Sequence, residues 1–234
     1  MKGRGIWIWR LNKCENGKLV DILKKCKKAN IEWIAVKCGN AGVPWEQFNA
    51  ALVTTCHVFG IKIYGWSYDL PTKIDEQVKV IKSISEIGAN GYIIDAETEW
   101  DKGVKNKAVE YMKKIRENVP SDFIIADAPW DVPTYHGGFP FKEFSVDVRS
   151  PQVYFIAHGI SFEKTWERYK KTWKDISKHV PSCSTWSKPT RKVTVSDIKK
   201  FEESAKQSGC PGVCHWEWAA IPRDIWEWFE NNKY

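Results

Sequence analysis

The chain lacks any apolar run of about 18 residues, which is the length that a membrane-spanning helix requires. It also lacks an apolar stretch of signal-peptide length near its start, where basic residues precede Trp7 and polar Arg10 follows soon after. We therefore expect Met1 to begin the mature protein. We also expect neither membrane insertion nor export through a cleaved signal peptide.

Paired cysteine motifs are missing as well. The seven cysteines are an odd number and none stands in a Cys-x-x-Cys pair, so the sequence predicts reduced thiols and a cytoplasmic setting. The cluster from Cys210 to His215 has the wrong spacing for a zinc knuckle, and we predict no metal and no other cofactor. The net charge of +7 favours an acidic partner, but no motif for nucleic-acid binding accompanies it.

Short apolar runs alternate with amphipathic stretches at a spacing of about 30 residues, the period of a strand followed by a helix. A typical amphipathic stretch carries Ile74, Val78 and Ile81 at helical spacing. No linker or low-complexity segment interrupts the pattern. Residues 1–234 therefore predict one α/β domain, a closed (β/α)8 TIM barrel, which we expect to be a monomer. The eight predicted strands are residues 5–9, 33–37, 61–67, 91–97, 123–126, 151–155, 182–186 and 212–218.

Three local features refine this prediction. Pro44 is expected near the start of the second helix, where proline is tolerated. Thr194 with Asp197 resembles a capping box and predicts a helix start. The aromatic, proline- and glycine-rich stretch 127–141 predicts a long loop, and loops of that length in compact domains are usually functional.

The fourth predicted strand, Gly91 to Glu97, ends in carboxylates. Side chains alternate across a strand, so Asp95 and Glu97 share one face with Ile93 beneath them. In a cleft, burial and like-charge proximity raise one pKa and leave the other group ionised, as a glycosidase needs. Isolated acids of this kind more often cap a helix or face solvent. Whether these two are catalytic therefore depends on the residues at the neighbouring strand ends.

Function in such a barrel belongs to the carboxyl ends of the strands. The chain has 14 tryptophans, and flat aromatic faces at strand ends suit the apolar faces of sugar rings. Asp69 is also a candidate, although an acid before a helix is more often a cap. The residues that we expect to bind substrate are Trp216, Gln152, Asp127, Asp69, Trp9, Lys37, Trp66, Trp186 and Glu99.

Three motifs resemble family 18 glycoside hydrolases. The run Asn90 to Glu97 is similar to their fourth-strand signature, Asp-Gly-x-Asp-x-Asp-x-Glu, with Asn90 and Ile93 in place of the first two acids. Gln152-Val153-Tyr154 is similar to their sixth-strand element, and Gly212 to Trp216 to their eighth. Family 25 lysozymes share the Asp-x-Glu, and residues 33–37 resemble their second strand, but their acid on strand one is absent here.

The resemblance implies a retaining, substrate-assisted glycosidase. Glu97 would protonate the glycosidic oxygen, Asp95 would assist the 2-acetamido group, and Tyr154 would hydrogen-bond that group. Glu99 or Asp127 would supply the charge that Ile93 lacks. Peptidoglycan is the expected substrate, in the manner of a lysozyme or of a phage lysin released without a signal peptide.

Alternatives remain open at this point. They are a chitinase-type hydrolase of chito-oligosaccharides and a non-catalytic carbohydrate-binding barrel, which typically loses the acid at position 97. A metal-dependent hydrolase is disfavoured because strand one has no histidine, and a phosphate-binding barrel because Trp186 and Trp216 make its strand ends bulky.

Overall fold

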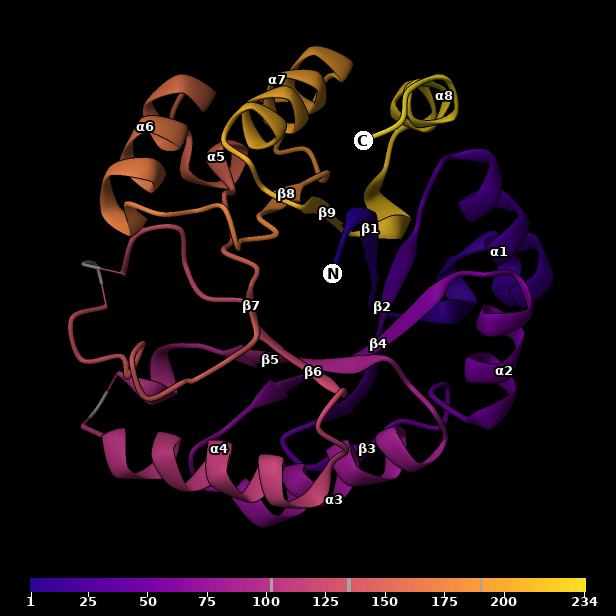
Figure 1. Cartoon of the computed structure of the whole chain (residues 1–234). Coiled ribbons are helices and arrows are strands. Elements are labelled where there is room, and N and C mark those ends of the chain that lie inside the picture. Colours follow the sequence, from indigo (N-terminus) through magenta and orange to yellow (C-terminus); the bar gives the residue numbers. More distant parts are fainter. Residues whose placement is uncertain (102, 134–135, 190) are drawn as a thin grey trace.

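The computed structural model describes residues 1–101, 103–133, 136–189 and 191–234. Eight parallel strands follow one another around a curled sheet in the order β7-β6-β5-β4-β2-β1-β9-β8, and helices surround it (Figure 1). Parallel bridges between Arg149 and His179 and between Gln152 and Ser182 join the two ends of this path. The fold is therefore the expected (β/α)8 barrel. Its parallel strands are β1 (Gly3–Ile8), β2 (Trp33–Asn40), β4 (Lys62–Asp69), β5 (Gly91–Ala96), β6 (Ile124–Asp127), β7 (Val148–Arg149), β8 (Ser182–Ser184) and β9 (Gly212–Trp216).

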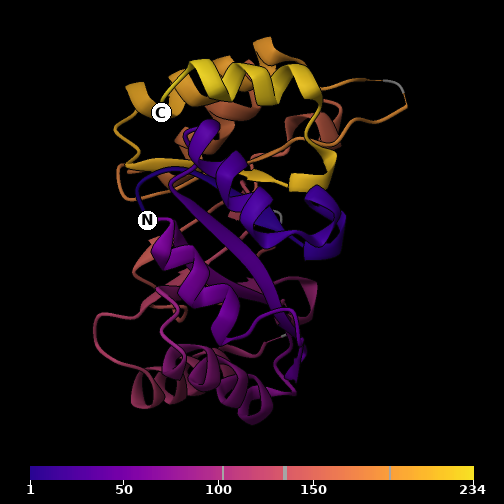
Figure 2. The same ribbon diagram turned by 90° about the vertical axis from the view of Figure 1, so that its right-hand side faces the viewer.

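The helices form an outer layer, and both labelled chain ends lie at the amino ends of the strands (Figures 1 and 2). Their apolar faces pack on the sheet as the periodicity predicts, with Ile74, Val78 and Ile81 all buried. No helix in the described ranges is long and apolar enough to cross a membrane. The helices are α1 (Leu19–Lys28), α2 (Ala50–Val58), α3 (Ile74–Glu86), α4 (Lys105–Asn118), α5 (Phe155–His158), α6 (Phe162–Trp173), α7 (Val195–Gln207) and α8 (Arg223–Asn231).

Two apolar layers meet at the sheet. Ile93 faces the barrel interior with Trp7, Trp33, Tyr64 and Trp66. Its neighbours Tyr92 and Ile94 face the helices and belong to the larger outer core. The alternation predicted for the fourth strand is thus confirmed.

Pro44 does not begin a helix, contrary to prediction. It lies in β3 (Val43–Pro44), which pairs antiparallel with the end of β2. The two residues between them, Ala41 and Gly42, have positive φ angles of 50° and 83°, the backbone of a tight two-residue hairpin. The helix begins later because Asn49 caps it, accepting a hydrogen bond from the Leu52 N–H.

The second part of the barrel also departs from the regular pattern. Between β6 and β7 the described residues form coil rather than a helix, and this coil fills the position between α4 and α6 (Figure 1). The sixth strand is only Val148–Arg149, earlier than predicted, and Gln152 contributes isolated bridges instead. The capping box at Thr194 is confirmed.

Candidate active site

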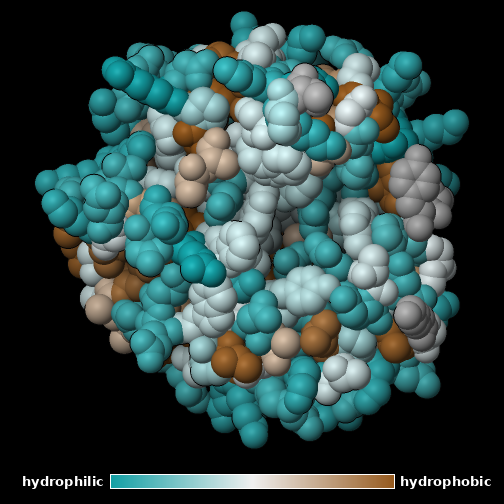
Figure 3. Space-filling view, turned by 180° about the vertical axis from the view of Figure 1, so that it is seen from behind, coloured by the Kyte–Doolittle hydropathy of each residue, from teal (hydrophilic) through white to brown (hydrophobic). Residues whose placement is uncertain are grey.

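A cavity of about 250 Å³ opens at the carboxyl ends of the strands. Seen from this side, the centre of the molecule is hollowed (Figure 3). The volume is below the ~300–1,000 Å³ typical of sites for drug-sized ligands, which suits a single ring of a longer polymer. The residues that line it are Trp7, Asp95, Glu97, Ala128, Gln152, Tyr154, Trp186 and Trp216.

The acids of the cavity come from β5. Asp95 stands one pleat beyond the buried Ile93, and Glu97 follows directly after the strand ends at Ala96. The strand is held rigidly because β4 and β6 pair with it on both sides. Asp95 and Glu97 therefore face the same space, as alternation requires.

Burial raises the pKa of both acids. For Asp95 burial is the main cause, the Glu97 and Asp69 charges add to it, and the Lys37 ammonium opposes it. For Glu97 burial again comes first and Glu99 adds to it, while His136 and a hydrogen bond with Gln152 lower the pKa. Two coupled acids of this kind share protons at a pH where isolated carboxyls are ionised. The pair can donate one proton and keep one negative charge.

Tryptophans form the floor of the cavity. The rings of Trp7, Trp66 and Trp216 meet edge to face, with centroids 5.2 to 5.6 Å apart. Trp7 is fixed further because its Nε1–H points at the Cys214 sulfur, 3.2 Å away. Trp186 and Trp216 are partly exposed and present ring surface to the cavity.

The opposite wall carries polar groups from the segment after β7. The Gln152 amide donates a hydrogen bond of 2.8 Å to the Ala128 carbonyl, which fixes its orientation beside Glu97. The Tyr154 hydroxyl lies 3.4 Å from the Ser182 hydroxyl. Both side chains are partly exposed in the cavity and retain hydrogen-bonding capacity for a ligand.

Asp69 lies outside the cavity, contrary to prediction. It stands three residues after the inward-facing Trp66, so alternation sends it to the outer layer. There its carboxylate accepts hydrogen bonds from the hydroxyls of Tyr92 (2.8 Å) and Tyr111 (2.9 Å). Burial raises its pKa to about 7. It is not a helix cap either, because Lys73 occupies the N-cap of α3.

Asp127 also faces outward, which corrects its assignment as a cavity residue. Its neighbours Ala126 and Ala128 face the interior, whereas the Asp127 carboxylate lies 3.7 Å from Arg149 and has no hydrogen-bond partner in the described structure. Burial raises its pKa to about 6.

The remaining predicted residues surround the cavity without lining it. Glu99 is exposed and accepts a 2.5 Å hydrogen bond from the Tyr68 hydroxyl. Trp9 is 42% exposed, and Trp66 is a buried member of the floor that packs against Trp7 and Trp216 without lining the cavity. Lys37 is buried among tryptophan rings. Glu99 affects Glu97 through its charge, but neither Glu99 nor Asp127 occupies the position that Ile93 leaves without an acid.

Sequence reasoning missed two features. Trp7 was not predicted to line the site, because Trp9 stands nearer the strand end. Alternation nevertheless points Trp7 inward, since its neighbours Ile6 and Ile8 face outward. His136 stacks on Trp130 at 3.4 Å between centroids, and its Nδ1 lies 2.7 Å from an Asp101 oxygen. No pattern in the predicted 127–141 loop indicates this contact. Residues 134 and 135 of that loop lie outside the described residues.

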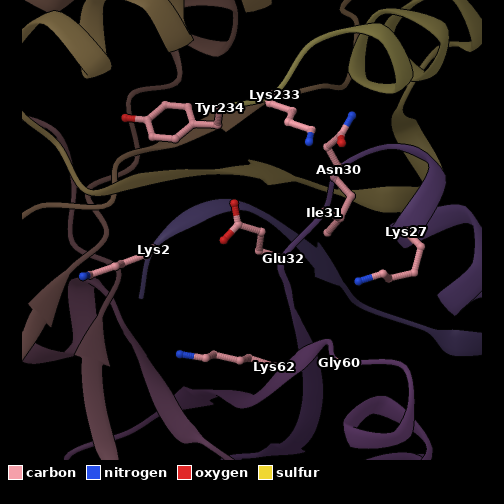
Figure 4. Close-up of a pocket in the computed structure, with 9 residues that line it drawn as sticks. All are labelled: Lys2, Lys27, Asn30, Ile31, Glu32, Gly60, Lys62, Lys233 and Tyr234. Atoms are coloured by element: carbon pink, nitrogen blue, oxygen red, sulfur yellow. The ribbon is translucent and has the colours of Figure 1, made fainter.

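A second hollow, of about 360 Å³, lies at the amino ends of the strands (Figure 4). Lysines from four separate segments border it, together with Glu32 and Tyr234. The described residues that line it include one acidic side chain and no tryptophan, so they offer neither a coupled acid pair nor a stacking floor. We therefore place the candidate active site at the carboxyl ends.

Comparisons by sequence find no matching family model and no matching curated protein. Solved structures do match. The glycoside hydrolase domain of PgaB (BpsB) from Bordetella bronchiseptica has a TM-score of 0.76 at 9% identity, covering 98% of each chain. The Bacillus cereus spore cortex-lytic enzyme SleL has a TM-score of 0.72 at 10% identity, covering 98% of this chain and 74% of that one. A family 18 N-acetylglucosaminidase from Paenibacillus barengoltzii has a TM-score of 0.71 at 9% identity, covering 99% of each chain. Likeness at such low identity shows the (β/α)8 fold.

Proposed function

We propose that this protein is a glycosidase that cleaves polysaccharides containing N-acetylhexosamine. One observation carries the proposal: Asp95 and Glu97 share a tryptophan-floored cavity with Gln152 and Tyr154. A coupled acid pair beside a flat aromatic surface is what hydrolysis of a sugar polymer requires. The shared fold of PgaB, SleL and the N-acetylglucosaminidase supports it.

The chemistry follows from the positions of the two acids. Glu97 donates its proton to the glycosidic oxygen, the bond to the anomeric carbon breaks, and the leaving sugar departs as an alcohol. The carbonyl oxygen of the substrate's own 2-acetamido group attacks the anomeric carbon from the other face. Asp95, as a carboxylate, stabilises the positive charge that develops on that group. The ionised Glu97 then takes a proton from water, whose oxygen opens the ring intermediate with net retention.

The other lining residues position the substrate. Tyr154 lines the same cavity and hydrogen-bonds the acetamido carbonyl, and the Gln152 amide holds Glu97 in place. Trp216 stacks against the sugar whose bond is cut. Each of these groups is fixed by a protein contact before substrate arrives, which is the condition for positional catalysis.

Peptidoglycan is the substrate that we favour. The net charge of +7 attracts an anionic wall, and SleL, which shares the fold, is named a spore cortex-lytic enzyme. The alternative is a chitinase-type activity on chito-oligosaccharides. The shared fold of a family 18 N-acetylglucosaminidase supports that alternative.

The test is digestion of purified peptidoglycan, chitin and chito-oligosaccharides, followed by mass analysis of the products. We expect soluble wall fragments with a new reducing end, which also identifies the bond cut, and a large loss of product with Glu97→Gln. Products from chitin alone would instead support the chitinase-type activity. Binding without products from any substrate would identify a non-catalytic sugar-binding barrel and refute the glycosidase.

A further inference from the structure

Lys37 lies in the row of interior side chains directly beneath Asp95. Strand pairing places Lys37 beside Trp66 and Trp66 beside Ile93, whereas Asp95 pairs one pleat further on with Tyr68. Ile93 is the position at which the resembling family signature has an acid. Lys37, Trp66 and Ile93 form one interior row across β2, β4 and β5. In this chain the ionisable group of that row is thus a cation instead of a second carboxylate.

The Lys37 ammonium has an unusual environment. The residue is only 6% exposed, and its Nζ lies 4.6 Å from the ring centroid of Trp66, 5.0 Å from Trp45 and 5.7 Å from Trp9. These three residues form a tryptophan cage. Within the described residues the ammonium has no hydrogen bond and no direct ion pair, so the ring faces are its nearest partners.

A buried cation without an ion pair is unfavourable unless a negative charge lies nearby. Burial lowers the pKa of Lys37, and Asp95 is the charge that most strongly opposes this effect, followed by Asp69 and Cys38. Arg10 is the other cation that acts on it. The coupling between Lys37 and Asp95 therefore acts through space across one pleat of the sheet.

We propose that Lys37 is a positioning residue for the reaction of the acid pair, whose caged ammonium favours the carboxylate form of Asp95 when Glu97 gives up its proton. The inference rests on the proposed function. At that moment both acids are negative, and the charges that balance them are the Lys37 ammonium below and the developing cation on the substrate above. Without Lys37 the site would carry two buried negative charges against one transient positive charge.

All ionisable groups that act on the pair enter the prediction. Asp95 interacts with Glu97, Asp69 and Lys37 and with the hydroxyls of Tyr68 and Tyr154, and Tyr68 also interacts with Glu97. Glu97 interacts in addition with Glu99 and His136. Substitution of Lys37 alone leaves every other group in place, so a change in the titration of the pair reports the lost ammonium.

The experiment compares Lys37→Met with Lys37→Arg in the full-length protein. An opposite charge nearby typically lowers a carboxyl pKa by about 1–3 units. We therefore expect the acidic limb of the kcat/KM profile of Lys37→Met, which reports ionisation of Asp95, to move to higher pH by about 1 unit, while Lys37→Arg keeps the wild-type profile. The basic limb should stay in place, because Lys37 is not among the charges that act on Glu97. A lower activity with the acidic limb unmoved, or a higher KM alone, would overturn the proposal and leave Lys37 a structural or substrate-contacting residue.

A second variant tests the coupling between Lys37 and Asp95 without measuring turnover. It remains usable if Lys37→Met fails to fold. Coupling between two charges is reciprocal. Asp95→Asn must therefore lower the pKa of the Lys37 ammonium, measured by nuclear magnetic resonance, and Glu99→Gln is the matched control that leaves it unchanged. An unchanged Lys37 pKa in Asp95→Asn refutes the inference. Absence of turnover in the wild-type protein refutes the proposed function instead.

Discussion

The two halves of the barrel are built differently. In the first half, residues 3–118, strands β1, β2, β4 and β5 are six to eight residues long and pair in nearly continuous register. In the second half, residues 124–234, strands β6, β7, β8 and β9 have two to five residues, and isolated bridges complete the sheet. The first half supplies the acids, and the second supplies Gln152, Tyr154 and Trp186. Long strands fix the direction of a side chain by alternation, whereas short ones leave it to turns and loops.

The largest expected effect tests the regular half. Glu97→Gln keeps the shape of the side chain and removes its transferable proton, so activity should fall by about 10²–10⁴-fold, as for a lost general acid. Oligosaccharide binding should survive. Glu99→Gln, two residues on and exposed, should be mild by comparison. Initial rates on cell wall or chito-oligosaccharide, with affinity from calorimetry, measure both.

The reverse order of the two substitutions would remove the site from β5. Near-full turnover by Glu97→Gln would have the same consequence. The long, regular strands of the first half would then not be what positions the catalytic acids.

The part that sequence could predict follows the same division. Alternation along the strand from the inward-facing Ile93 correctly places Asp95 and Glu97 on one face. Alternation from the inward-facing Trp66 likewise sends Asp69 outward, but the predicted strand ends at residue 67 and does not reach Asp69. The sixth strand was misplaced because two residues are too few for a periodic signal.

Other features depend on tertiary contacts that no local pattern encodes. The cage around Lys37 needs Trp45, which follows the unpredicted β2–β3 hairpin. The stack of His136 on Trp130 joins two positions in a coil. Such contacts become visible only when the whole barrel has been assembled.

The next prediction compares how one buried acid from each half makes the free energy of unfolding depend on pH. Burial raises the pKa of Asp69 from 3.8 to about 7, so between these values the folded protein holds a proton that the unfolded chain has released. The free energy of unfolding therefore falls as pH rises from about 4 to about 7, by at most about 4 kcal/mol at about 1.36 kcal/mol per unit. Asp69→Asn should remove this slope in urea unfolding at pH 5 and pH 8.

Asp127 is the matched acid of the second half. Its pKa is raised only to about 6, so Asp127→Asn should remove a smaller share of the slope, confined to about pH 4–6. Equal slopes in the wild-type protein and in Asp69→Asn would mean that the carboxyl is not held neutral between its two tyrosines.

A smaller effect concerns the floor of the cavity. Trp216→Ala should weaken binding of an N-acetylglucosamine oligomer by about 1 kcal/mol or more, roughly fivefold in Kd, since an aromatic platform is lost. Trp228→Ala, on α8 and away from the cavity, is the control and should leave Kd unchanged. Loss of stability with no change in Kd would make Trp216 a core residue.

The smallest effect asks whether the two halves unfold together. Asn49 caps α2 in the first half, and Thr194 caps α7 in the second; both side chains accept a hydrogen bond from a helix N–H. Replacing either with Ala should cost about 1 kcal/mol and lower Tm by about 2–4 °C for a chain of this size. Because the halves share a continuous sheet and an interior core that draws on both, each substitution should lower one common transition. Hydrogen exchange read by mass spectrometry distinguishes the cases: a cooperative barrel loses protection in both halves in either variant. Loss confined to residues 3–118 in Asn49→Ala, or to residues 124–234 in Thr194→Ala, would instead mark a boundary between two separately stable units, and the irregular half would then be a distinct folding unit.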